Sequence, residues 1–177
     1  RKDMIEEFII YVNKNDYSLN NTINKSDYET NSFLLNKTVT LIEYAAFFGS
    51  IQIFRYLLSN SAQVTPKLWI YGIHSDNPEL ISLFEENKIN PPSNSYVSCY
   101  TESIKCHHNQ MANYIQSNFL KEGEENSPVV RNAIFESFNF EFFQNDFENK
   151  CDLYYLVKYN YTYFVKVMIY FLYILNL

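Results

Sequence analysis

Glycine and proline are scarce in this sequence, whose 177 residues include only 3 Gly and 5 Pro. Sandwiches and barrels made of many short strands need more turn-forming residues than this, so the scarcity argues against both. Three glycines are also too few to form a glycine-rich phosphate-binding or dinucleotide-binding loop, and no G-x-S-x-G segment is present. The composition favours helices joined by short polar loops, and we expect neither enzymatic activity nor a cofactor.

Basic charge and cysteine are limited as well. The formal net charge is −6, whereas non-specific binding of nucleic acid needs a basic face that replaces phosphate counterions. We therefore expect no nucleic-acid partner. The three cysteines, Cys99, Cys106 and Cys151, are odd in number, and no signal-peptide pattern precedes them. Reduced thiols in a cytoplasmic or nuclear protein are the expectation.

The chain is instead rich in apolar and aromatic residues, at 47% and 18%, which is enough for a buried core. Its most regular stretch runs from Thr40 to Asn60 and predicts two short helices. Thr40 and Glu43 have the spacing of a capping box, which satisfies free amides at a helix start. Gly49 ends the first helix, and the second has apolar residues at helical spacing: Ile53, Phe54, Leu57 and Leu58.

The same plan recurs along the chain at intervals of roughly 30 residues, a period typical of helical-pair repeats. In the second copy Asn77 is the predicted helix cap, and Pro78 occupies the first helical position, where its missing amide costs nothing. The sequence predicts four to five degenerate units, at about 40–64, 65–93, 94–122, 127–149 and 150–177.

Residues 1–39 precede these units and are expected to pack on them. Asp3 and Glu6 form a D-x-x-E start followed by apolar residues at helical spacing, which predicts a helix from about Asp3 to Asn13. Residues 14–37 are polar and rich in asparagine. We interpret them as an irregular connector with one short turn around residues 28–35.

The first unit resembles the ankyrin repeat, whose pattern it matches at Thr40, Ala45, Ala46, Gly49, Leu57, Leu58, Ala62 and Val64. Ser61 replaces the glycine that usually ends the second helix. The chain is similar to the ankyrin-like proteins of the DUF3447 domain family in "YETNSFLLNK", "TLIEYAAFFGSIQIFRYLL", "SDNPELISLFEENKI" and "SIKCHHNQMANYI". The resemblance implies an all-α, ankyrin-like solenoid with few or no β-hairpin fingers. It also implies a scaffold or protein–protein interaction role with no chemistry attached.

A partner protein is expected to bind the face formed by the first helices of the pairs. Phe47 and Phe48, just before Gly49, are predicted to lie on this inner-helix face, and later units place His74, Lys105 and Lys158 at equivalent positions. The candidate partner-binding residues are Tyr44, Phe47, Phe48, His74, Lys105 and Lys158. The alternative is that the connector, through Phe33 and Leu34, folds over Phe47 and Phe48 and buries them.

Four residues are candidate zinc ligands: Cys99, Cys106, His107 and His108. Neither a C-x-x-C nor an H-x-x-x-H spacing occurs, and a fourth ligand would have to come from elsewhere. The repeat alignment places His107 at the break between two helices. We therefore predict a polar turn with buried cysteines, and no metal.

The segment from Tyr161 to Leu177 is almost wholly apolar, interrupted by Lys166. A membrane-tethered adaptor anchored by this segment is the alternative function, although the length is at the lower limit for a span. Its first half matches the second helix of a repeat, which favours a last unit without a polar cap. Self-association or aggregation through Val167–Leu177 is expected whether or not the segment meets a membrane.

Overall fold

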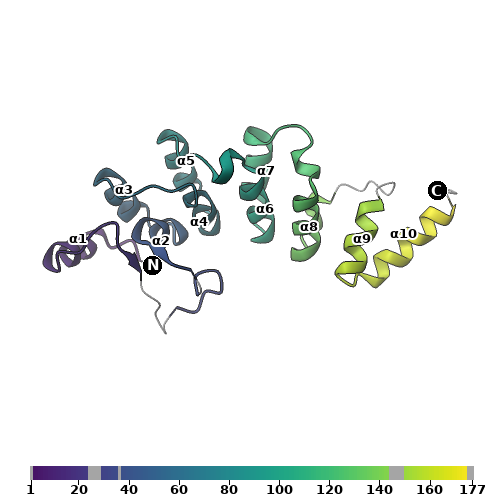
Figure 1. Ribbon diagram of the computed structural model, residues 1–177, viewed down its shortest axis with the longest axis horizontal. Helices are drawn as coiled ribbons and strands as arrows, with labels where there is room; N and C mark the ends of the chain where they lie inside the picture. The colour runs from purple at the N-terminus through teal and green to yellow at the C-terminus, as the bar shows by residue number, and fades with distance from the viewer. Residues whose placement is uncertain (1, 24–28, 36, 144–149, 175–177) are drawn as a thin grey trace. The chain divides into compact units, whose positions relative to one another are not determined.

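The computed structural model describes residues 2–23, 29–35, 37–143 and 150–174. Over these residues the chain is mostly helical, with ten α-helices and one two-stranded sheet (Figure 1). The prediction of an all-α fold is therefore confirmed. None of the helices in this part of the chain is both long and apolar enough to span a membrane.

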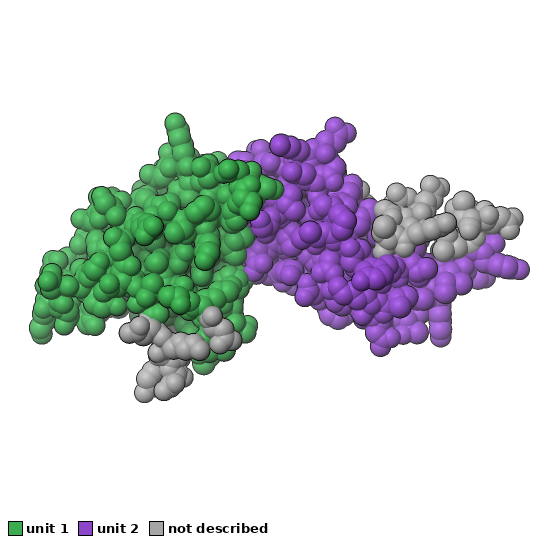
Figure 2. All heavy atoms as spheres, viewed as in Figure 1, with its two compact units in different colours: residues 1–95 green, residues 96–177 purple. Residues whose placement is uncertain are grey.

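The elements form two compact units, residues 1–95 and 96–177 (Figure 2). The first unit contains α1 (Ile5–Lys14), β1 (Thr22–Ile23), β2 (Val39–Thr40), α2 (Leu41–Phe47), α3 (Ile51–Ser59), α4 (Leu68–Ser75), α5 (Pro78–Glu86) and the 3-10 turn η1 (Pro92–Asn94). The second contains α6 (Val97–Lys105), α7 (Asn109–Phe119), η2 (Glu124–Asn126), α8 (Pro128–Ser137), η3 (Phe140–Phe142), α9 (Lys150–Lys158) and α10 (Thr162–Ile174).

The described part of the connector between α1 and α2 contains a strand that its sequence did not predict. Strand β1 pairs antiparallel with β2, with Thr22 opposite Thr40 and Ile23 opposite Val39. The predicted turn is present over its described residues, where the amide of Leu34 donates to the carbonyl of Asn31 at 3.0 Å. The strand pair was missed because two-residue strands leave no alternating pattern in the sequence.

Asp3 does not cap α1, so the predicted D-x-x-E start is wrong. The N-cap of α1 is Met4, which makes no side-chain capping bond. Instead the carboxylate of Asp3 accepts hydrogen bonds from the amides of Gln52 at 2.7 Å and Ile53 at 3.0 Å, in the first turn of α3. A negative charge there satisfies free amides and complements the helix dipole. The N-terminal segment is thereby fixed to the first helix pair.

The predicted capping box of α2 is present. The amide of Glu43 donates to Thr40 Oγ1 at 3.3 Å, and the amide of Thr40 donates to Glu43 Oε2 at 3.0 Å. The other carboxylate oxygen of Glu43 accepts from the hydroxyl of Thr65 at 3.0 Å. Since Thr65 precedes α4, this buried glutamate joins the first helix pair to the second.

Five of the described helices, α2, α4, α6, α8 and α9, are each followed by a break that contains one residue in the left-handed conformation. These residues are Gly49 (φ 62°), Asp76 (φ 49°), His107 (φ 58°), Phe138 (φ 61°) and Asn160 (φ 59°). At four breaks the next amide donates to the carbonyl five residues earlier, as in the bond from Ser50 to Ala45 at 2.9 Å; the others are His108 to Ser103, Asn139 to Ile134 and Tyr161 to Leu156. This is the hydrogen bond that closes a helix in the Schellman motif. Four of the five breaks therefore share one closing hydrogen bond, although only the first contains a glycine.

Ser61, at the end of α3, also adopts the left-handed conformation at φ 60°, and Lys88 does the same after α5 at φ 54°. The replacement of glycine by Ser61 thus leaves the helix end intact. No strand occurs over residues 61–67, all of which are described.

The core of the first unit lies where α2 and α4 pack together and against α3 and α5. Ala46 has no exposed surface, and Phe54, Trp69 and Phe84 are fully buried. The indole amine of Trp69 donates to the carbonyl of Ile89 at 2.6 Å. Gly72 of α4 lies directly against the Phe84 ring, because a Cβ atom at this position would be 2.7 Å from Phe84 Cζ.

The core of the second unit's C-terminal half is formed by α8, α9 and α10. Phe135 stacks on Tyr155 with ring centroids 5.6 Å apart, and Met168 of α10 packs beneath them. The buried carboxylate of Asp152 pairs with the guanidinium of Arg131 at 2.6 Å. A cavity of about 120 Å³ remains between these helices, lined by apolar side chains: Phe135, Phe140, Phe143, Leu156, Phe164, Val167 and Met168.

Candidate binding surface

The four candidate residues of the first unit lie together, and an aromatic side chain of the connector covers one of them. Phe33 stacks on Phe47 with ring centroids 5.6 Å apart and a 15° angle between the planes. It also lies 3.9 Å from the centroid of His74 and meets Tyr71 edge-on at 5.5 Å. As a result Phe47 is only 6% exposed. Phe47 is therefore buried under the connector, which was the alternative interpretation of the sequence, and it is not an exposed anchor.

Phe48 and Tyr44 remain partly exposed next to this buried ring. Their ring centroids are 4.7 Å apart, and Phe48 contacts Phe47 edge-on at 5.0 Å. The hydroxyl of Tyr44 donates to the carboxylate of Glu29 at 3.2 Å, which is a second attachment of the connector. The cover over the first unit is therefore partial, and Phe48 contributes apolar surface at its edge.

A groove of about 480 Å³ opens on the other side of Tyr44, where α1 and the connector meet α2 and α3. Its lining is mainly apolar, with Lys2 and Glu7 the charged members; the others are Met4, Phe8, Tyr11, Ile23, Leu41, Tyr44, Ala45, Ser50 and Ile53. Apolar grooves with a few polar groups are the common form of a binding site. Tyr44 is the single candidate residue that lines it.

The two candidate residues of the second unit belong to a polar strip that crosses α6, α8 and α9. The ammonium of Lys105 pairs with the carboxylate of Glu136 at 3.0 Å, and that of Lys158 donates to Asn132 Oδ1 at 2.7 Å. Asn132 also donates to Glu136 at 3.3 Å and accepts from the hydroxyl of Tyr159 at 3.0 Å. The strip is solvent-exposed, since the side chains of Lys105 and Glu136 are 39% and 47% exposed.

Glu136 and Asn132 were missed by the sequence analysis, although a signal for Glu136 existed. One residue lies two positions before each of these left-handed breaks, and we call this set the first-helix row: Phe47, His74, Lys105, Glu136 and Lys158. Glu136 belongs to it because Phe138 forms the fourth break. Phe138 was overlooked because a bulky residue seldom adopts positive φ.

Neighbouring members of the row contact each other within each unit. The rings of Phe47 and His74 are stacked at 5.0 Å in the first unit, and Lys105 pairs with Glu136 in the second. Lys158 bonds to Asn132, which lies one helical turn before Glu136 on α8. Successive first helices thus present equivalent residues side by side, which gives a continuous face within each unit.

The candidate zinc ligands have different structural environments. Cys99 is completely buried, and burial raises the pKa of its thiol to about 12. A zinc ligand must be a thiolate, so this environment disfavours metal binding. His107 forms the third break, and its Nε2 lies 2.8 Å from the carbonyl oxygen of Ser137. The side chain of Cys151 lies outside the described residues.

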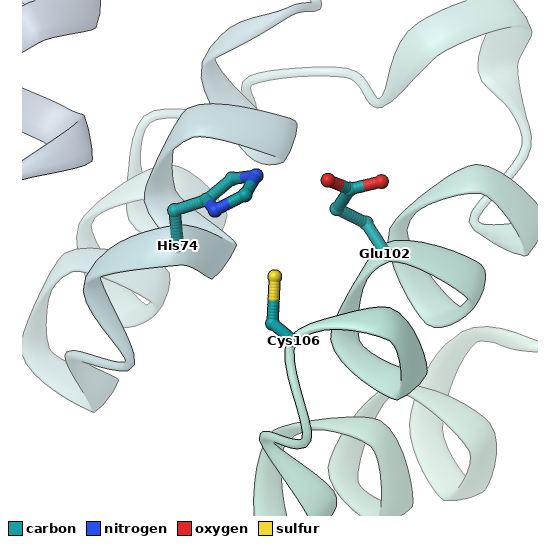
Figure 3. A group of neighbouring side chains, drawn as sticks. All are labelled: His74, Glu102 and Cys106. Carbon is teal, nitrogen blue, oxygen red and sulfur yellow. The ribbon is translucent and has the colours of Figure 1, made fainter. Parts of the chain in front are cut away.

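Cys106 follows α6 directly, and its amide donates to the carbonyl of Glu102 one turn earlier, at 2.9 Å. Figure 3 labels both side chains together with His74, which comes from α4 of the first unit. Among the described residues of either unit taken alone, no group of three candidate metal ligands lies close together. Two ligands are fewer than the three or four that zinc takes from a protein.

The chain was compared with protein-family models, with curated proteins and with solved structures, and none of the three comparisons finds a match. The resemblance to the DUF3447 family therefore stays a prediction from the residues quoted above.

Proposed function

We propose that this chain is a protein–protein interaction module, built as an ankyrin-like array of helix pairs, and that a partner protein binds along its first-helix row. The observation that carries the proposal is the side-by-side contact of equivalent residues within each unit: Phe47 with His74, and Lys105 with Glu136. Such contacts are expected where helix pairs stack in the same orientation, as they do in repeat proteins. A stacked array exposes an extended face with no catalytic machinery.

The chemistry of the row suits a partner with mixed character. In the first unit Phe47 of the row is buried, and the exposed edge beside it is formed by Phe48 and Tyr44. Aromatic residues contribute strongly to binding energy at protein interfaces. In the second unit the strip alternates positive and negative charge over Lys105, Glu136 and Lys158, and charged groups of this kind set orientation and association rate. We infer that the partner makes an apolar contact with the first unit and a complementary charged contact with the second.

The test is capture of partner proteins from a lysate of the source cell by two matched variants. The row variant is Lys105→Glu with Lys158→Glu. The control is Lys67→Glu with Lys121→Glu, which makes the same change in net charge at two exposed lysines outside the row. We expect the row variant to lose partners that the wild type and the control both retain, with melting temperatures of all three within a few degrees. Equal capture by both variants would contradict a binding role for the row.

A third variant, Phe48→Ser, tests the aromatic edge. Phe48 is partly exposed, so folding stability is expected to change little while capture of the same partners falls. Unchanged capture would restrict the binding face to the second unit.

A further inference from the structure

Residues 29–35 of the connector form a small turn that is held by their own hydrogen bonds, and we call them the connector turn. The amide of Asn31 donates to Glu29 Oε1 at 2.9 Å, and the amide of Phe33 donates to Asn31 Oδ1 at 2.9 Å. The amide of Leu34 donates to the carbonyl of Asn31 at 3.0 Å. An asparagine side chain that bonds the backbone two residues on defines an Asx turn. The conformation is therefore encoded locally, and a separate segment with the same residues can adopt it.

The connector turn places one aromatic ring in a slot between two first helices. The Phe33 ring stacks on Phe47 of α2 at 5.6 Å and lies 3.9 Å from the ring centroid of His74 on α4. Tyr71 of α4 meets the same ring edge-on at 5.5 Å. We call the surface formed by Phe47, Tyr71 and His74 the ring slot, which suits a flat apolar side chain. Leu34 is 5% exposed, so the position after the ring is apolar as well.

The cover over the ring slot is supplied by the connector and not by the helix pairs. Phe47 and Lys105 have the same place in the first-helix row, yet Phe47 is 6% exposed while the side chain of Lys105 is 39% exposed. The difference arises because Phe33 stacks on Phe47. The connector turn therefore occupies, in the first unit, a face that the helix pairs of the second unit expose.

A segment of the same chain competes with any partner for such a site. Tethering close to the site gives it an effective concentration on the order of millimolar. A competing segment then binds with an apparent affinity that is reduced by the fraction of closed chains. Displacement is favourable only for a segment that fits the slot as well as the connector turn does or better, which makes the turn a guide to the chemistry of the partner.

We propose that the connector turn is an internal ligand of the ring slot, and that a partner protein displaces it with a segment of the same chemistry. The expected segment has an asparagine or aspartate, an aromatic residue two positions later and an aliphatic residue directly after the ring. The side-chain oxygen forms the turn, the ring fills the slot, and the aliphatic side chain takes the place of Leu34. This proposal rests on the proposed function and deepens it, because it states what the first unit recognises.

The test titrates the full 177-residue chain with a capped synthetic peptide of residues 29–35, E-T-N-S-F-L-L, and follows the NMR signals of Tyr71 and His74. The Phe33→Ala chain, whose slot is open, should bind the peptide at least about ten-fold more tightly than the wild type, in which the turn must open first. The matched control is Leu35→Ala, which removes a 42% exposed side chain from the same turn and should bind like the wild type. A peptide with alanine in place of its phenylalanine should bind neither chain.

Equal affinity of the wild type and the Phe33→Ala chain would overturn the proposal, and so would equal binding of the alanine peptide. No binding to the Phe33→Ala chain at about 2 mM peptide would also overturn it and would make Phe33 a core residue only. If Phe33→Ala does not fold, Glu29→Ala replaces it, because it removes the acceptor of the Asn31 amide and of the Tyr44 hydroxyl without changing the ring slot. This variant should bind several-fold more tightly than the wild type, and an unchanged affinity would count against the internal ligand.

The result is distinguishable from that of the lysate capture, which probes the second unit through Lys105 and Lys158. Peptide binding in the ring slot, together with unchanged capture by the charge variant, would remove the second unit from the proposed function and leave the internal ligand standing. Capture that depends on the two lysines, with no peptide binding, would refute the internal ligand alone.

Discussion

Gly72 provides the sharpest test of the packing between α4 and α5, and we predict that Gly72→Ala destabilises the first unit. An alanine at an interior helix position normally stabilises by about 1 kcal/mol relative to glycine. Here its Cβ would lie 2.7 Å from Phe84 Cζ and 3.4 Å from Leu80 Cδ2. The sign of the measured change therefore decides between helix propensity and close packing.

The magnitude depends on whether Phe84 can move. Its ring is fully buried and held between Trp69, at 5.4 Å, and Phe54, at 5.6 Å. Overpacking a rigid core costs typically 1–3 kcal/mol. We take the upper part of this range and subtract the gain in helix propensity, which gives a net loss of about 2 kcal/mol. For a unit of this size the loss corresponds to a drop in melting temperature of roughly 10 °C.

Urea denaturation followed by tryptophan fluorescence measures this change directly, because Trp69 is the only tryptophan and lies in α4. Ser82→Ala and Ser82→Gly, at an exposed position of α5, measure the helix-propensity difference without the steric effect. Phe84→Leu, combined with Gly72→Ala, should show a favourable coupling of about 1 kcal/mol, because the ring is what the alanine meets. A Gly72→Ala variant as stable as the wild type would refute the reasoning.

Three further predictions concern the cap, the thiols and alkaline pH. Asp3→Ala should destabilise the first unit by about 1 kcal/mol in urea denaturation, since two amides of α3 lose their acceptor. Cys99 should resist iodoacetamide at pH 8 until the chain is unfolded, whereas the less buried Cys106 should react in the native state, as read by peptide mass mapping. Burial, and then the nearby Glu43 charge, raise the pKa of Tyr71 from 10.0 to about 12. The unfolded state therefore loses this proton first, so stability should be complete below pH 10 and fall as the pH rises towards 12, and Tyr71→Phe should reduce the fall in urea midpoint.

Local interactions were the part of the fold that the sequence could predict. The capping box of Thr40 and Glu43 and the helix start at Asn77 and Pro78 each involve residues within a few positions of one another. Such interactions leave a fixed spacing in the sequence. The spacing of these capping signals was sufficient to predict a succession of short helices.

Contacts between distant residues were harder to predict. The carboxylate of Asp3 has the right spacing to cap its own helix, yet it caps α3 almost fifty residues away. The sequence indicated that Phe33 and Leu34 could cover Phe47, but it did not show whether Phe47 is covered or exposed. In the structure Phe33 stacks on Phe47. Both outcomes depend on which tertiary partner offers the better contact, and residue spacing does not encode that choice. Glu136 was missed because the break after α8 is formed by a phenylalanine at positive φ.

The cavity between α8, α9 and α10 has a consequence for the response of the chain to hydrostatic pressure. Pressure favours the state of smaller volume, and internal voids are lost when a protein unfolds. This apolar pocket of about 120 Å³ is partly open to solvent, and the part of it that stays dry contributes to the volume decrease on unfolding. We therefore expect compression to unfold the last helices of the second unit before the tightly packed helices around Trp69.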